Sequence, residues 1–401
     1  MIRILFKTLS VGALLPALAA ILVLSAPSPH ANAQTLFVGN SSSNQTTSFT
    51  SGTTTYTSAV IGNTSTDSNN TLNVLNPGTR LTINGGNVQV GFAGSGNSMV
   101  ISNGGFVSGS NGVISFGNTG SNNSALVTGA GSTWSNSNQV RIGVSGSGTL
   151  TVANGGSVIA SGVNGIQVAV NAGSMGVLNI GSYGGNDSAG SIVAPKIGFN
   201  SGTGYLNFNQ TDTFTLTNEI TGANTIFFQQ LGSGTTILTG ANSSANSTFI
   251  SQGTLQIGDG GANGSIGSRA ITNNSVLAIN SSTEVTFRSG NGITGTGVLI
   301  QMGTGTTILT GSNTTYSGGT LISNGTLRVG AGPTGSSGDT NGSLGTGNVT
   351  NNATLAFSRR FASDTVSNNI SGTGALRMFG SGVLTLAGSN SYSGLTTINS
   401  G

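Results

Sequence analysis

The sequence predicts an all-β protein that folds as a right-handed parallel β-helix (β-solenoid) after a signal peptide is cleaved. Three observations lead there. A phrase of seven residues recurs along the chain, glycine occupies 68 of 401 positions, and only 5% of residues are charged. Ordinary globular domains carry about a quarter charged residues. Disorder needs high net charge and low hydrophobicity, so this low charge argues against it.

The recurring phrase decides the architecture. Gly-Thr-Thr-Ile-Leu-Thr-Gly occupies 234–240 and again 305–311, and a looser copy, Gly-Val-Leu-Thr-Leu-Ala-Gly, occupies 382–388. The copies end 311 − 240 = 71 and 388 − 311 = 77 residues apart. Such repetition is typical of stacked repeats, in which each unit packs only against its neighbours. The additional residues fall within 332–339, which predicts an external loop there.

Residues 1–33 are predicted to be a cleaved signal peptide. Arg3 and Lys7 form a basic start, 8–24 is nearly all apolar, and Ala31-Asn-Ala33 is an Ala-x-Ala cleavage signal. The alternative is a membrane anchor, which needs about 20 apolar residues. Cleavage removes two basic residues and the only histidine, His30, so the formal net charge falls from +3 to 9 − 8 = +1. The remaining basic residues are scattered, which argues against nucleic-acid binding.

The mature chain divides into three predicted parts. Residues 34–70, rich in Ser, Thr and Asn, are expected to be an N-terminal cap or lead-in. Residues 71–219 carry a short repeat of alternating apolar and polar residues followed by Asn-Gly-Gly, as in 150–156. The alternation places Leu150 and Val152 on one face of a strand, and Asn-Gly accepts the positive φ of a tight turn.

Residues 220–401 carry a longer unit, whose fullest copy is 303–330. It reads as three short strands separated by two turns. Such strands bury their apolar residues only when coils stack in parallel, so Leu327 is expected to face the core and Asp339 the solvent. Coils of about 20 to 25 residues would give roughly 15 to 18 turns. The alternative folds are an antiparallel sandwich and a propeller, but repeat lengths are uneven and periodic aromatics are missing.

These motifs resemble the passenger domains of Gram-negative autotransporters, the type V secretion family. The unit at 303–330 is similar to the autotransporter-associated β-strand repeat, and 380–401 is a second copy with Asn390, Tyr392-Ser-Gly394 and Ile398 in place. The stretch from Gly129 through Trp134 to Gly156 resembles a neighbouring repeat of the same family.

The resemblance implies an exported, non-enzymatic passenger, an adhesin or a stalk-type scaffold, at the cell surface or outer membrane or secreted. Its expected partners are an outer-membrane translocator barrel, in cis or missing from this fragment, and glycans or a host or bacterial surface. The given sequence stops inside a repeat, so such a barrel would lie on sequence not given. The absence of cysteine suits export in an unfolded state, since no disulfide can trap the chain.

The mature sequence offers little catalytic chemistry. Without His or Cys it has no Ser-His-Asp triad, Cys-His dyad or ordinary zinc site, so no catalytic, cofactor-binding or metal residue is predicted and no cofactor. The glycine-rich string at 143–148 opens no helix and is not read as a dinucleotide loop. The runner-up function is a carbohydrate-active β-helix enzyme, a polysaccharide lyase or glycoside hydrolase.

That alternative needs acids brought together by the fold. The eight acidic residues of the mature chain are never within four positions of one another: Asp67, Asp187, Asp212, Glu219, Asp259, Glu284, Asp339 and Asp364. Asp259 and Glu284 are about one coil apart and are the first pair to check. Lys196 is the only lysine left after cleavage, in an expected turn. Trp134 is either a sugar platform or, the favoured interpretation, a packing aromatic.

Overall fold

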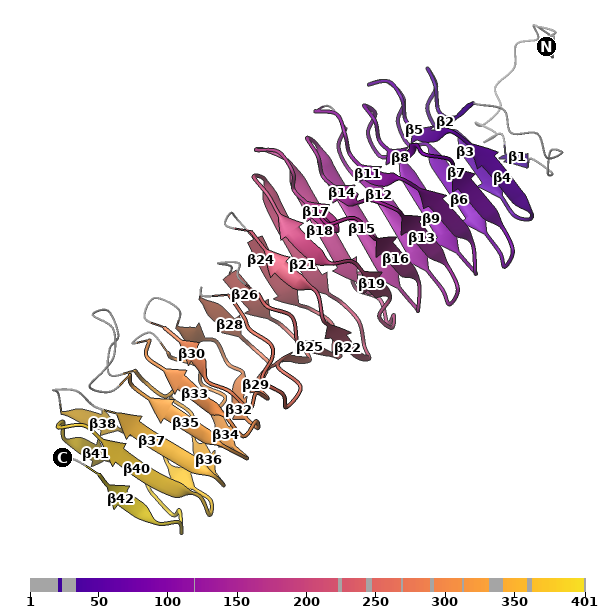
Figure 1. Ribbon diagram of the computed structural model, residues 1–401. Helices are drawn as coiled ribbons and strands as arrows, with labels where there is room; N and C mark the ends of the chain where they lie inside the picture. The colour runs from indigo at the N-terminus through magenta and orange to yellow at the C-terminus, as the bar shows by residue number, and fades with distance from the viewer. Residues whose placement is uncertain are drawn as a thin grey trace, which may run out of the picture.

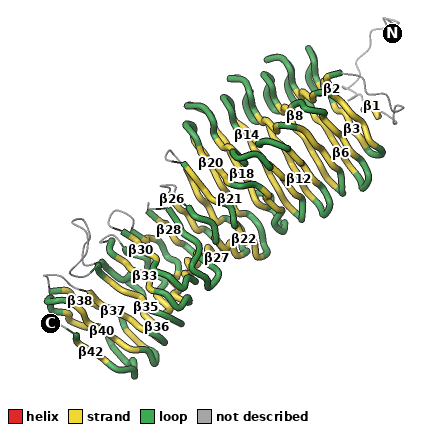
Figure 2. Tube along the Cα trace, in the orientation of Figure 1, coloured by secondary structure: helices red, strands yellow, loops and turns green. Residues whose placement is uncertain are grey.

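The computed structural model is a long stack of β-coils with its two ends at opposite extremes (Figure 1). It describes residues 21–23, 34–118, 120–222, 226–242, 247–267, 270–288, 292–311, 314–331, 342–358 and 363–399. The signal-peptide residues Arg3, Lys7, His30 and Ala31–Ala33 lie outside these residues, as do Asp339 and the 332–339 insertion. Throughout the described part there are only strands, bridges, turns and bends (Figure 2).

Strands of successive coils pair in parallel and build six sheets. Sheet A runs along most of the stack: β1 Ile21–Val23, β3 Thr46–Phe49, β6 Thr71–Leu75, β9 Ser98–Ser102, β12 Asn123–Thr128, β15 Ser147–Ala153, β18 Met175–Ile180, β21 Thr203–Phe208, β24 Ile226–Gln230, β26 Ser247–Ile250, β28 Ile271–Asn273 and β31 Ile293–Thr294. Sheets B and C complete the coils of the N-terminal part. Sheet B holds β2 Thr35–Val38, β5 Ser58–Ile61, β8 Asn87–Val90, β11 Asn111–Ile114, β14 Val140–Ile142, β17 Ile166–Val168, β20 Lys196–Phe199 and β23 Glu219–Thr221. Sheet C holds β4 Thr53–Tyr56, β7 Arg80–Ile83, β10 Phe106–Gly109, β13 Thr133–Asn136, β16 Ser157–Ala160 and β19 Ser191–Val193.

The C-terminal part uses three further sheets. Sheet D holds β22 Thr213–Leu216, β25 Thr235–Leu238, β27 Thr254–Ile257, β29 Val276–Ile279, β32 Val298–Gln301, β34 Thr320–Ile322, β36 Val349–Asn351 and β39 Ile370–Ser371. Sheet E holds β30 Val285–Phe287, β33 Thr306–Leu309, β35 Thr326–Val329, β37 Thr354–Ser358, β40 Ala375–Phe379 and β42 Thr396–Ile398. Sheet F holds β38 Asp364–Val366 and β41 Leu384–Leu386.

The predicted all-β parallel solenoid is therefore confirmed, with about 14 turns. The expected 15 to 18 turns were too many because the N-terminal coils are longer than assumed. Paired strands there are offset by 28 residues, as between Leu150 and Leu178, whereas Phe228 and Thr248 are only 20 apart. The change of coil length falls between β21 and β24. The right-handed sense stays the expectation that chain chirality favours.

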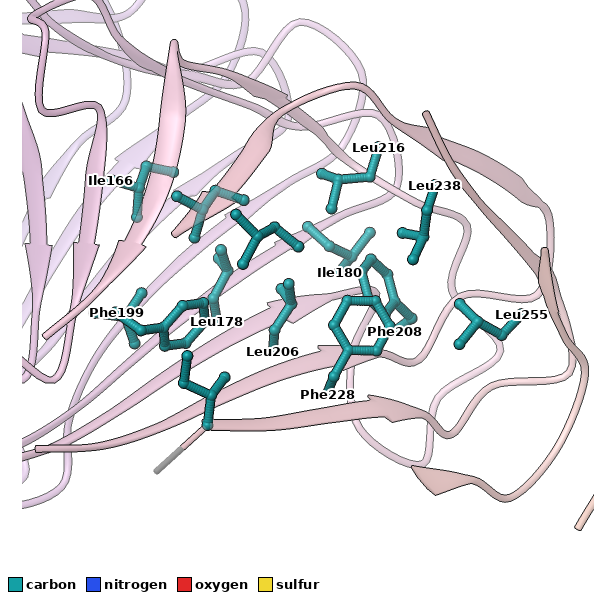
Figure 3. Packing of buried hydrophobic residues seen from close by; sticks show 14 of the residues in the cluster. Ile166, Leu178, Ile180, Phe199, Leu206, Phe208, Leu216, Phe228, Leu238 and Leu255 are labelled. Atoms are coloured by element: carbon teal, nitrogen blue, oxygen red, sulfur yellow. The ribbon is translucent and has the colours of Figure 1, made fainter. Parts of the chain in front are cut away.

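The core follows the predicted period of two. Leu150 and Val152 are fully buried, and the Thr side chains between them face outward. Leu327 is also fully buried, opposite Leu355 of the next coil. Figure 3 shows this apolar column continuing past the change of coil length, where Phe208 and Phe228 pack with ring centroids 5.0 Å apart. The core is thus one narrow cluster along the axis, which explains why each coil depends on its neighbours.

The Asn-Gly turns adopt the conformation expected of them. Asn154 and Gly155 have φ of 50° and 75°, and Asn103 and Gly104 have 52° and 84°. Residues with a Cβ avoid this region, apart from Asn and Asp, so the pair is favoured wherever the coil turns sharply. Among the described residues no helix is long and apolar enough to cross a membrane.

The seven-residue phrase moves around the stack from one copy to the next. Its first copy contains β25 of sheet D, its second β33 of sheet E and its third β41 of sheet F. Coils visit the sheets in the order A, D, E, and F later takes the place of A, between β37 and β39. Successive copies therefore lie three coils plus one face apart, which is why their spacing is not a multiple of one coil.

Candidate functional site

A buried clasp of polar side chains precedes the phrase in two of its copies. The amide nitrogen Nε2 of Gln301 donates to the carbonyl oxygens of Gly303 at 2.8 Å and Gly305 at 3.3 Å, and Thr307 donates its hydroxyl to Gln301 Oε1. Gln301 and Thr307 are each 1% exposed. The clasp fixes the tight turn between two strands by satisfying buried carbonyl groups.

The earlier copy repeats the clasp with the same residue types. Gln230 Nε2 donates to Gly232 and Gly234 carbonyls, and Thr236 donates to Gln230 Oε1 at 2.6 Å. The third copy has Met378 and Leu384 at the matching positions. Both polar partners are thus replaced together, so that neither remains unpaired in the core. The shared Gln-x-Gly-x-Gly-Thr-Thr spelling was the sequence signal for this clasp.

A tyrosine clasp holds the next turn. The hydroxyl groups of Tyr316 and Thr320 are 2.6 Å apart, and those of Tyr392 and Thr396 are 2.9 Å apart. Tyr316 is fully buried, and burial raises its pKa to about 12, so it stays a neutral hydrogen-bonding group. These features stabilise turns and offer no reactive group to solvent.

The suspected acid pair, Asp259 and Glu284, has local partners. Asp259 Oδ1 accepts a hydrogen bond from the Gly261 amide at 3.1 Å, and Glu284 Oε1 accepts one from the Thr286 hydroxyl at 3.1 Å. Both residues are exposed and lie outside the strands. Within the described residues there is no group of three or more His, Cys, Asp or Glu side chains that could hold a metal ion.

The fold instead brings together the segments of Asp187 and Asp212, a pairing that no sequence pattern predicts. The Thr211 amide donates to the Asp187 carbonyl at 3.0 Å, and the Ala189 amide donates to Asp212 Oδ1 at 2.8 Å. Asp187 Oδ1 accepts from Asn154 Nδ2 at 3.0 Å. Hydrogen bonds from Ser182 and Asn154 lower the pKa of Asp187, whereas a glycosidase acid needs a raised one. The pair therefore serves as an anchor for a loop.

Trp134 and Lys196 are placed by the structure. Trp134 lies in β13 and is fully buried, so it cannot be a sugar platform, and its indole fills space beside Gly112. A Cβ on Gly112 would meet the indole at 2.5 Å, so glycine is required there. Lys196 lies in β20 beside Glu219 of β23, not in a turn as expected.

The most developed recess of the surface is a hollow of about 370 Å³ beside the loop that follows β18, and we call it the Tyr183 hollow. It lies where the coils shorten, between β18 and β26. Its lining comes from four segments on successive coils: Tyr183–Asn186, Asn209 with Thr211, Leu231–Ser233, and Ser251 with Gln252. None of these described lining residues is charged.

The loop that carries Tyr183 is held on both sides. Asn154 of the preceding coil accepts from the Ser188 amide and donates to Asp187, while Thr211 and Asp212 of the following coil bond Asp187 and Ala189. A turn closed by Gly185 N–H to Ser182 C=O, at 3.0 Å, presents Tyr183 at the rim with 80% of its surface exposed. The hollow is therefore formed before any ligand arrives.

One wall of the hollow contains an unpaired acceptor. Asn209 Nδ2 donates to Asn179 Oδ1 at 3.4 Å and to the Gly181 carbonyl at 3.2 Å. Its own amide oxygen is buried and has no partner in the described part of the chain. Asn207 Nδ2 also donates to Asn179 Oδ1, at 2.9 Å, so the two amides lie on the same side of the strand. The hollow thus continues the outer face of sheet A.

An aromatic pair lies farther along that outer face. Tyr205 and Phe227 are register partners on β21 and β24, with ring centroids 4.9 Å apart and planes 15° from parallel. Tyr205 precedes Asn209 by four residues, which is about 13 Å along a strand. A second hollow, of about 500 Å³ beside Gly318, Gly319 and Asn348, has no aromatic side chain in its described lining.

Comparison with known proteins gives one finding. Residues 228–257, 299–329 and 376–401 match the family model of the passenger-associated-transport-repeat. These repeats, in a parallel β-solenoid, are typical of autotransporter passenger domains, and the chain contains three of them. Searches of curated proteins and of solved structures gave no match. The comparison identified no catalytic family.

Proposed function

We propose that this chain is a non-enzymatic passenger, displayed at the cell surface or released, which acts as a stalk or adhesin. The observation that carries this is the set of three passenger-associated transport repeats built into one continuous stack. Passenger domains with these repeats are exported, and the predicted signal peptide at 1–33 would supply the first step.

The rotation of the repeats favours a structural role for them. Because successive copies fall on sheets D, E and F, their equivalent side chains do not line up on one face. A binding array would need such a line. What the copies share is buried: the Gln–Thr clasp in two of them and the Tyr–Thr clasp in two. The repeats therefore serve folding and stiffness, and any ligand is bound by features outside them.

The carbohydrate-active enzyme remains the second candidate, because the Tyr183 hollow lies beside Asp187 and Asp212. Against it, hydrogen bonds lower the pKa of Asp187, and Asp212 holds a backbone amide. Hydrolysis of a glycosidic bond requires one carboxyl group that is protonated near neutral pH.

Surface display tests the leading proposal. Residues 1–401 would be joined to the translocator domain of an established autotransporter and produced in a Gram-negative host. We expect protease added to intact cells to digest the chain and N-terminal sequencing to begin at Gln34. A chain that stays protected in intact cells, or that keeps Met1, would contradict the proposal.

A further inference from the structure

We propose that the Tyr183 hollow binds a neutral sugar residue of a glycan. This inference rests on the proposed function, because a passenger displayed outside the cell meets glycans there. It assigns one site on the stack to ligand binding, where the fold alone offers only a long surface.

The chemistry of the lining matches a ligand with many hydroxyl groups and no charge. Side-chain amides and hydroxyl groups face the hollow from Asn186, Asn209, Thr211, Ser233 and Gln252, and each group can donate or accept. The described lining has no cation to hold a phosphate, sulfate or uronate group. The volume of about 370 Å³ is at the small end of the range of ligand pockets, about 300–1,000 Å³.

Tyr183 supplies the apolar surface that a sugar also needs. A pyranose ring carries C–H groups on its faces, and an aromatic ring with its negative face offers them a stacking partner. At 80% exposure the tyrosine packs little against its own chain, so its ring is accessible from solvent. Its hydroxyl group adds a donor at the rim.

The anchored loop keeps this aromatic ring in place. Three backbone amides donate hydrogen bonds that tie the loop to neighbouring coils: Thr211 N to Asp187 O, Ala189 N to Asp212 Oδ1, and Ser188 N to Asn154 Oδ1. Binding therefore costs little ordering of the protein, which favours even a small ligand.

The outer face of sheet A extends the site. Asn207 and Asn209 lead from the hollow towards the Tyr205–Phe227 pair, over about 13 Å. A linear oligosaccharide of several residues can reach both aromatic surfaces, whereas a monosaccharide contacts only one. Affinity should consequently rise with chain length.

Isothermal titration calorimetry on the purified full chain tests this inference. The probes are maltohexaose, cellohexaose, mannohexaose and chitohexaose, their monosaccharides, and polygalacturonate as an acidic comparison. We expect at least one neutral hexaose to bind, more tightly than its monosaccharide and with little dependence on salt.

Variants separate the hollow from the rest of the surface. Tyr183→Ala should weaken binding about tenfold, and Tyr183→Phe should weaken it less because the ring is kept. Ser233→Arg, at an exposed position, should abolish binding by filling the hollow. Phe37→Ala is the matched control, since Phe37 is an aromatic of sheet B that is 43% exposed and distant in register from the hollow.

The inference is overturned if none of the four hexaoses binds, if Tyr183→Ala binds as well as the parent, or if polygalacturonate is preferred. Surface protease digestion stays a separate readout. A chain that is displayed but binds no hexaose refutes the sugar site alone, and a chain that is never displayed refutes the proposed function.

Discussion

The Gln301–Thr307 clasp makes a quantitative prediction about paired substitutions. Gln301→Met removes the acceptor of the Thr307 hydroxyl and the donor to the Gly303 carbonyl. Each buried group left unpaired costs about 1–3 kcal/mol, so the local stability should fall by about 2–5 kcal/mol. Thr307→Val leaves Gln301 Oε1 without its donor and should cost about 1–3 kcal/mol.

The double variant, Gln301→Met with Thr307→Val, should cost less than the sum of the two. With both partners apolar, as at Met378 and Leu384, the hydroxyl and its acceptor disappear together, and we expect a coupling of about 1–2 kcal/mol. Native-state hydrogen exchange of the amides in β32 and β33 is the assay, because a repeat stack opens in parts. Thr304 is in the exposed turn between these strands, so Gln301→Met with Thr304→Val serves as an additive control. Additive costs in the double variant as well as in the control would refute the clasp.

Further predictions concern the core, pH and chemistry. Leu327→Asp buries a carboxylate without a partner and should cost several kcal/mol in chemical denaturation, while the same residue introduced at exposed Thr304 should change stability by about 0.5 kcal/mol or less, and equal costs would contradict the assigned faces. Burial alone would raise the pKa of Asp67, but hydrogen bonds from Thr64 and Ser41 hold it below its usual value. Its contribution is therefore present above about pH 4 and is lost as pH falls through the lowered pKa, so thermal stability should drop below about pH 4, and less so in Asp67→Asn. Purified chain should release no reducing or unsaturated sugars from pectin or alginate; turnover abolished by Asp187→Asn, Asp212→Asn, Asp259→Ala or Glu284→Ala would establish the enzyme instead.

The fold was readable from the sequence because its determinants are local. Period-two strands such as Leu150–Val152, the Asn154-Gly155 turn and the repeated phrase each state their geometry within a few residues. The number of coils was not, because it depends on how many residues each turn takes. That length changes from 28 residues in the N-terminal part to 20 after β24.

The candidate site could not be read in the same way. Tyr183, Asn209, Leu231 and Ser251 come from four different coils, and only the register of those coils brings them to one hollow. Likewise, the sequence pointed to Asp259 and Glu284, but the approach of Asp187 to Asp212 depends on a loop that leaves its own coil. For Trp134 the sequence left two interpretations open, and the burial of its strand decides for the packing aromatic.

Disulfide trapping tests the parallel stacking of coils most directly, and the chain offers a clean background because it has no cysteine. Thr306 and Thr326 are register partners on β33 and β35, one strand spacing of about 4.8 Å apart, which suits a disulfide. We predict that the Thr306→Cys, Thr326→Cys variant forms an intramolecular disulfide on mild oxidation, detected by peptide mass mapping. The pair Thr306→Cys, Arg328→Cys, displaced by two residues to about 8 Å, should remain reduced. Equal oxidation of both pairs, or of the displaced pair alone, would contradict the stacked register.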